Sequence, residues 1–259
     1  DIAARNHHLV AHMNTAKWFS DNDPDNYWYD RGNGIYKSVD GGLSWDSLAF
    51  TSTNTPQSFD TDFDFIWNIK TDISNDSLDV LYAATYGSIY RSEDGGSTFT
   101  KELGGGSAYY TNVDVTSTGV VYAAISTTYS PATDKGIWRS SDGQNWTNIL
   151  DTAFPLTYGR VAIGINPSNE NEIYFLAAET DGYGQHTDVF FGGETWTSLW
   201  KYTYISGDGT GLGGQWTDLS SNIPANQNTS FDNFNAQGGY DLLVKVHPSQ
   251  QDVVYIGGT

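Results

Sequence analysis

The chain has 259 residues and a formal net charge of −19, with 12 Lys and Arg against 31 Asp and Glu. This charge repels nucleic acid and anionic membranes, so we expect neither as a partner. Cysteine is absent, which excludes disulfides, and no apolar run is long enough to span a membrane. Aromatic residues make up 15% and glycines number 28, a composition typical of short strands joined by tight turns.

The first feature in chain order is an acidic stretch, "DNDPDN", at residues 21–26. Asp21, Asp23 and Asp25 alternate as they do in the first half of a calcium-binding EF-hand loop. Asn26 replaces the required glycine and Gly32 replaces the closing glutamate, so the full motif is not met. Two interpretations stay open here: a looser Ca²⁺ loop, or a solvated acidic loop.

Next comes a turn motif that the chain repeats. "KSVDGGLSW" at 37–45 returns in "YRSEDGGSTF" at 90–99 and "WRSSDGQNW" at 138–146, and a degenerate copy follows in "YISGDGTGLGGQW" at 204–216. The aromatic residues that close the copies are 54, 47 and 70 residues apart. The first two steps lie near the period of about 40 to 50 residues typical of propeller blades.

The segments between the turns read as strands. Apolar and β-branched residues alternate in "DVLYAATYGSIYRS" (79–92), and the same layout recurs around the later copies. The pattern predicts units of four short strands at about 1–50, 51–104, 105–151 and 152–220, with a fifth unit at 221–259 cut off after its second strand. An unfinished unit would expose a sheet edge, so we expect the chain to be part of a longer polypeptide.

The Ser-x-Asp-x-Gly-x-x-Trp turn resembles the Asp-box, or BNR repeat. That repeat occurs in sialidases, in xyloglucan-cleaving endoglucanases, in Vps10/sortilin ectodomains and in exported bacterial proteins. The resemblance covers nearly the whole chain. It implies an all-β fold, namely a β-propeller of six or more four-stranded antiparallel blades, of which this chain is an incomplete part.

The residues of the repeat have structural explanations. The aspartates can accept hydrogen bonds from backbone N–H groups of their own turn, and the serines can add a second bond. Glycines permit positive φ, and each closing aromatic residue is expected to fill the gap between neighbouring units. Because every blade repeats this chemistry, it cannot form a single site. The predicted structural set is Ser38, Asp40, Gly42, Trp45, Ser92, Asp94, Gly96, Phe99, Ser140, Asp142, Trp146, Ser206, Asp208 and Trp216.

Function is therefore expected on the opposite side of the blades, where long loops carry aromatic and acidic residues. Aromatic rings can stack on sugars while polar side chains bind hydroxyl groups, although the same rings could instead pack the loops. The candidates for ligand binding are Trp18, Tyr27, Trp28, Tyr29, Tyr183, His186 and Trp196.

An enzyme remains the alternative. Sialidases need three clustered arginines, but only Arg5, Arg31 and Arg160 lie outside the repeat and no motif links them. An endoglucanase needs two acidic residues across a cleft, and the sequence does not select two from Asp30, Asp60, Asp62, Asp181 and Asp188. The sequence favours a non-catalytic, secreted or cell-surface propeller that binds a glycan or a surface protein, with a glycoside hydrolase as the alternative.

Overall fold

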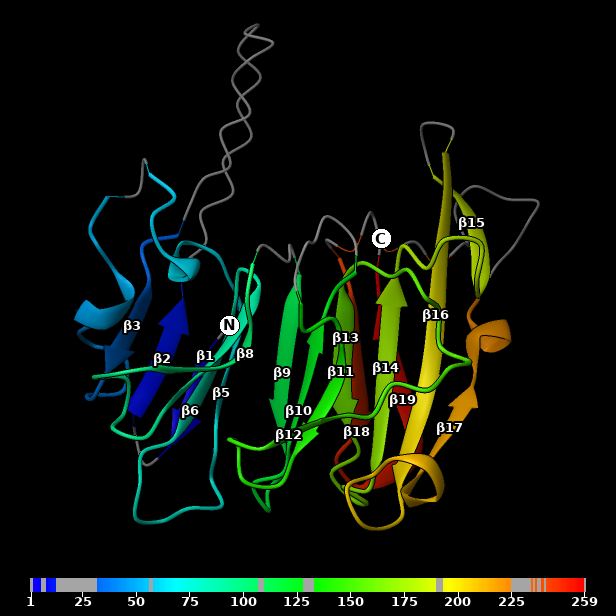
Figure 1. The fold of residues 1–259 in the computed structure, drawn as a ribbon. Coiled ribbons are helices and arrows are strands. Elements are labelled where there is room, and N and C mark those ends of the chain that lie inside the picture. The colour runs from blue at the N-terminus through cyan, green and yellow to red at the C-terminus, as the bar shows by residue number, and fades with distance from the viewer. Residues whose placement is uncertain are drawn as a thin grey trace, which may run out of the picture.

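The computed structural model describes residues 2–5, 8–12, 32–55, 58–106, 110–127, 133–189, 193–224, 234, 236, 239 and 241–258. Side chains are described from residue 32 onward, except those of 186–195. Within these ranges the chain forms antiparallel β-sheets (Figure 1). The helical elements among them are single 3-10 turns: η1 (Ala49–Thr51), η2 (Asp62–Asp64), η3 (Gly211–Gly213) and η4 (Ser220–Asn222).

Three sheets consist of four strands paired in chain order, and we call them blades 1 to 3. Blade 1 contains β1 (Ile2–Arg5), β2 (His8–His12), β3 (Ile35–Ser38) and β4 (Asp46–Ser47). Blade 2 contains β5 (Ile66–Thr71), β6 (Leu81–Thr85), β7 (Ser88–Ser92) and β8 (Thr100–Gly104). Blade 3 contains β9 (Thr111–Val115), β10 (Val121–Ile125), β11 (Gly136–Ser140) and β12 (Trp146–Asn148).

Blade 4 has an additional strand. It contains β13 (Val161–Ile165), β14 (Glu172–Ala178), β15 (Gln185–Val189), β16 (Gly193–Tyr204) and β17 (Gly214–Asp218). The first part of β16 pairs with β15 and the last part with β17. The sequence predicts a loop at 180–198, but the structure forms a hairpin there, and its threonines are typical strand residues. In the part of the chain that the structure describes, blade 5 contains β18 (Leu243–His247) and β19 (Gln250–Gly257).

The blades are arranged around a common axis. The first strand of each blade contacts the first strand of the next, in the order β1, β5, β9, β13 and β18 (Figure 1). This arrangement confirms the prediction of an all-β propeller with four-stranded antiparallel blades, of which the chain forms an incomplete part.

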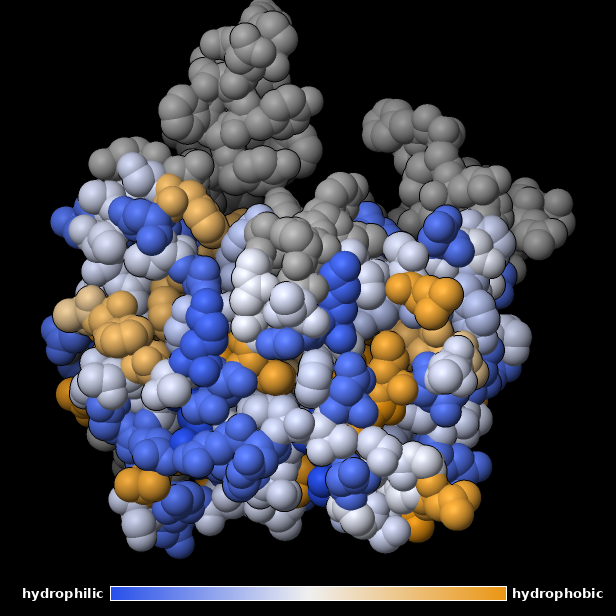
Figure 2. Space-filling view, in the orientation of Figure 1, coloured by the Kyte–Doolittle hydropathy of each residue, from blue (hydrophilic) through white to orange (hydrophobic). Residues whose placement is uncertain are grey.

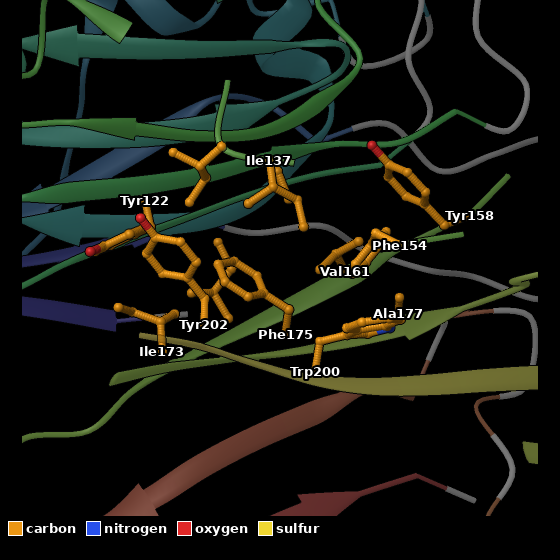
Figure 3. Close-up of a cluster of buried hydrophobic side chains, with 13 residues drawn as sticks. Tyr122, Ile137, Phe154, Tyr158, Val161, Ile173, Phe175, Ala177, Trp200 and Tyr202 are labelled. Atoms are coloured by element: carbon orange, nitrogen blue, oxygen red, sulfur yellow. The ribbon is translucent and has the colours of Figure 1, made fainter. Parts of the chain in front are cut away.

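The hydrophobic core lies between the blades. β6 and β10 are buried at every position, because a neighbouring blade covers each face of their sheets. A strand buried on both faces reads as a continuous apolar run and not as an alternation. Figure 3 shows the cluster between blades 3 and 4, where Tyr122 and Ile137 pack against Phe175 and Trp200. Burying one such large side chain contributes about 1.5 to 3 kcal/mol.

The repeated turns join the third strand of a blade to the fourth, and we call their side of the molecule the turn side. In blade 1, Ser38 Oγ donates to Asp40 Oδ1 at 2.8 Å and accepts from the Gly42 backbone N–H at 2.8 Å. Asp40 also accepts from the backbone N–H of Ser44 at 2.9 Å. Gly42 has a φ of 91°, a conformation that a side chain would strain.

Blades 2 and 3 repeat this network. Ser92 and Ser140 donate to Asp94 and Asp142 at 2.8 and 3.0 Å. The degenerate copy in blade 4 differs, because Asp208 accepts from the backbone N–H and the hydroxyl of Thr210 at 3.0 and 2.8 Å. Four turns at equivalent places thus hold themselves together through bonds that span at most four residues.

The closing aromatic residues pack toward the preceding blade. Phe99 joins Ile35 of blade 1 in one cluster, and Trp216 donates its indole N–H to the Ile149 carbonyl of blade 3 at 2.9 Å. Trp45 departs from this pattern, since it is 39% exposed. No blade precedes blade 1 in the described part of the chain, so the prediction that Trp45 fills a gap between two units stays a prediction.

Candidate functional site

Most of the predicted ligand-binding residues lie outside the described part of the chain. Trp18, Tyr27, Trp28 and Tyr29 belong to this group, as does the side chain of His186. The acidic triplet Asp21, Asp23 and Asp25 also lies outside it. The glycan and calcium predictions for these residues therefore stay predictions.

Tyr183 has contacts within blade 4. Its ring stacks on Trp200 with centroids 5.7 Å apart, and its hydroxyl donates to Asp218 at 2.8 Å. Desolvation and the hydrogen bond to Asp218 raise the pKa of Tyr183 to about 12. Trp196, the other described candidate, is half-buried and accepts a backbone bond from Thr180 at 3.2 Å. The contacts of Tyr183 are those of a packing residue.

Two of the acidic candidates have partners within the protein. Asp60 accepts from the hydroxyls of Thr53 at 2.9 Å and Thr55 at 2.6 Å, which hold the pKa of Asp60 below its ordinary value. Asp62 faces three donors with a single oxygen, Oδ2. Asp181 is exposed, while Asp30 and the side chain of Asp188 lie outside the described residues.

The donors to Asp62 come from blade 2. Lys101 Nζ lies 2.9 Å from Oδ2, Tyr90 donates its hydroxyl at 2.8 Å, and Ser88 donates at 3.0 Å. Desolvation and the bond to Asp62 raise the pKa of Tyr90. Asp62 is thus anchored to blade 2 through its Oδ2 atom.

A cavity among the described residues lies on the axis, between the first strands of blades 2, 3, 4 and 5. We call this cavity of about 680 Å³ the axial pocket. Its size falls within the range of about 300 to 1,000 Å³ typical of ligand sites. Its walls include Trp67, Asn68, Ile69, Lys70, Thr71, Asn112, Arg160, Ala162, Ile163, Asp241, Leu242, Leu243, Val244, Lys245, Gly257 and Gly258.

The pocket reaches the side of the molecule opposite the repeated turns, which we call the loop side. Trp67 stands at the start of β5, Arg160 immediately precedes β13, and Asp241 lies two residues before β18. These strands begin where the connections between blades end. The C-terminal end of β19 lies on the same side, at the upper edge of Figure 1, whereas the turn between β16 and β17 lies at the lower edge.

Trp67 is the aromatic wall of the axial pocket. Its ring lies 4.7 Å from that of Phe65 and 4.9 Å from that of Tyr110, between centroids. The guanidinium of Arg160 lies 5.2 Å from the Trp67 ring centre, and Arg160 Nη1 donates to the Gly239 carbonyl at 3.3 Å. Trp67 is half-buried, so part of its ring is held rigidly and part faces the pocket.

Amide side chains connect the inner strands across the pocket floor. Asn68 Nδ2 donates to Asn112 Oδ1 at 2.8 Å and to the Val113 carbonyl at 2.9 Å. Asn112 Nδ2 in turn donates to the Val161 carbonyl at 3.0 Å. This chain of bonds joins blades 2, 3 and 4 and fixes the positions of the polar groups on the wall.

Charged side chains also line the axial pocket. Lys70 Nζ lies 3.2 Å from Asp114 Oδ1. Desolvation lowers the pKa of Lys245, the charge of Lys70 lowers it further, and Asp114 acts in the opposite direction. The two lysines therefore share one carboxylate, and Asp241 acts electrostatically on Arg160.

The sequence carries one signal for this pocket, which the repeat pattern does not reveal. The first strands alternate polar residues with apolar ones, as in Asn68 and Lys70 of β5 or Asn112 and Asp114 of β9. Period-2 polar residues on a strand that lies at the centre of a propeller must face either the axis or the neighbouring blade. Arg160 was recognised only as an arginine outside the repeat.

The surface in Figure 2 is largely hydrophilic, with separate hydrophobic patches. Among the described residues, no group of three or more His, Cys, Asp or Glu is placed to hold a metal ion. The described residues also include no helix with the length and apolar character needed to cross a membrane.

Comparison with known protein families found no match, and comparison with curated proteins found none. Solved structures do resemble the fold. The GH74 enzyme of Niastella koreensis is 19% identical with a TM-score of 0.61, covering 97% of this chain and 33% of that one. The GH74 xyloglucanase of Xanthomonas campestris is 15% identical with a TM-score of 0.60, covering 99% of this chain and 35% of that one. The chain thus spans about a third of the length of these enzymes, and the likeness is one of fold.

Proposed function

We propose that the chain binds a polysaccharide on its loop side, with one sugar unit held in the axial pocket against Trp67. The observation that carries this proposal is the composition of the pocket wall. A rigid aromatic ring stands beside amide and charged side chains, and together they offer stacking and hydrogen bonds to a ring that bears hydroxyl groups. The fold likeness to a xyloglucanase supports a carbohydrate ligand.

We further propose that the four turns are Asp-box repeats and that the protein acts outside the cell. The shared hydrogen bonds of Ser38 and Ser92 support the first point. The second follows from the proposed ligand, because a protein that binds polysaccharides is expected to meet them outside the cell.

The binding proposal is tested with a glycan array followed by calorimetric titration of the best ligand, using xyloglucan oligosaccharides as the first probe. Trp67→Ala is expected to weaken binding at least about tenfold, the equivalent of about 1.4 kcal/mol. Trp45→Ala is the matched control, because it removes a partly exposed tryptophan from the turn side. Equal losses in both variants, or no binding to any glycan, would contradict the proposal.

Glycoside hydrolysis is the second candidate, and the likeness to GH74 enzymes favours it. The hydrogen bonds to Asp60 and Asp62 argue against a catalytic pair formed by these two carboxylates. Release of reducing sugar from xyloglucan decides the question. We expect none that depends on them, and activity that is lost in Asp60→Asn or Asp62→Asn would establish the hydrolase instead.

A further inference from the structure

Three basic residues of the described chain, Lys70, Arg160 and Lys245, line the axial pocket. Outside the pocket, several ammonium or guanidinium groups each face a carboxylate of their own: Lys37 with Asp79, Arg91 with Glu93, Lys101 with Asp62 and Lys201 with Glu172. Inside the pocket, Lys70 and Lys245 share Asp114. The cavity wall carries three cations, Lys70, Arg160 and Lys245, and the carboxylate of Asp241. When Asp114, which pairs with Lys70 from outside the wall, is counted as well, one positive charge is in excess.

This excess is notable because the chain as a whole is so acidic. Only 12 of its residues are Lys or Arg, and three of these line one cavity from three different blades. Lys245 is exposed to solvent, so an anion can reach its ammonium group and form a charge-assisted hydrogen bond there. Partial desolvation lowers the pKa of Lys245, although its side chain remains accessible.

From this charge arrangement we infer that the axial pocket binds a carboxylate group of its ligand, namely that of a uronic acid unit, through Lys245 and Lys70. The inference rests on the proposed function and specifies its substrate class. Lys245 supplies the charge that has no carboxylate of its own, Lys70 lies beside it, and Trp67 lines the same cavity and accepts the sugar ring.

The net charge of the whole protein restricts the class of possible ligands further. A net charge of −19 repels a continuous polyuronate, whose many carboxylates would each approach an acidic surface. A single excess positive charge neutralises a single carboxylate. The fitting ligand is therefore a largely neutral polysaccharide with isolated uronic acid residues.

The experiment compares two probes by calorimetric titration. One is an oligosaccharide of neutral sugars that bears a single glucuronic acid, and the other is the same compound with its carboxyl group reduced to an alcohol. We expect the acidic probe to bind about tenfold more tightly, with the preference shrinking as salt rises because ion pairing is screened. Lys245→Gln should abolish the preference and Lys245→Arg should retain it.

A matched control is Lys201→Gln, which removes a lysine outside the pocket and should keep the preference. Thermal unfolding of each variant checks that it remains folded. Equal binding of both probes overturns the inference and leaves the proposed function intact. An acidic preference that survives in Lys245→Gln also overturns it, whereas binding of neither probe overturns the inference together with the proposed function.

Discussion

The turn side and the axial pocket use polar residues in opposite ways. On the turn side, the same Ser and Asp pair recurs in blades 1, 2 and 3, and each pair bonds within a few residues of itself. In the axial pocket, each blade contributes different residues, and the bonds join different blades. Polar residues that are repeated in each blade stabilise that blade. Polar residues that occur only once and meet at the common axis can form a binding site.

The largest expected effect concerns the aromatic residues that close the turns. Phe99 is buried between blades 1 and 2 whereas Trp45 is partly exposed. We expect Phe99→Ala to lower the free energy of unfolding by about 3 to 5 kcal/mol through loss of burial and creation of a cavity. Trp45→Ala should cost less than about 1 kcal/mol. Urea denaturation measures both, and equal costs would show that both aromatic positions face similar surroundings.

A smaller effect is expected where the inner strands are joined. Asn112 is buried, and its removal takes away one of the two acceptors of the Asn68 amide and the side-chain donor to the Val161 carbonyl. Asn112→Ala should destabilise the protein by about 1 to 3 kcal/mol. Asn75→Ala is the control, because Asn75 bonds only within an exposed turn. A similar cost for both would mean that the amide chain does not connect the blades energetically.

The turns themselves should contribute less. Asp142 accepts from the backbone N–H groups of Gln144 and Asn145 at 2.9 and 2.7 Å. Asp142→Ala is expected to cost about 1 kcal/mol, since solvent screens this exposed turn. Asp208→Ala in the degenerate copy should cost less, because Asp208 bonds only to Thr210. Thermal unfolding ranks the loss of stability in the two variants. A larger loss in Asp208→Ala would contradict the inference that the degenerate turn is held by fewer bonds.

The smallest effect is a dependence on pH. Hydrogen bonds from the Ser44 side chain and backbone lower the pKa of Asp40 from its ordinary 3.8 to about 2. A carboxyl group with a depressed pKa stabilises the fold above its unfolded pKa, and this stabilisation disappears as the pH falls through the folded pKa. The difference in melting temperature between wild type and Asp40→Asn should therefore shrink between pH 4 and 2. A difference that stays constant across that range would exclude this contribution.

The same comparison explains what the sequence could predict. The hydrogen bonds of the turns were predictable because Ser38, Asp40 and Ser44 are close in the chain. The repetition of the motif also supported the same prediction for each copy. The exposure of Trp45 was not predictable, because it depends on what lies beside blade 1. The axial pocket joins Trp67, Arg160 and Lys245, and only the stacking of blades brings residues so far apart in sequence together.

The acidic candidates show a second limit of prediction. Asp60 and Asp62 have the residue type that hydrolysis requires, and sequence alone could not reveal that threonine hydroxyls and Lys101 hold them in place. Carboxyl groups become catalytic through their environment. Only the three-dimensional contacts distinguish a structural aspartate from a reactive one.

The central claim is that ligand binding occurs at the non-repeated residues on the axis and not at the repeated turns. Hydrogen–deuterium exchange with and without a saturating glycan ligand tests this most directly. We predict slower exchange on binding in peptides that cover 65–71, 110–114 and 241–245, with no change at 38–45, 92–99 or 140–146. Protection confined to the turn peptides, with the axial peptides unchanged, would contradict the account.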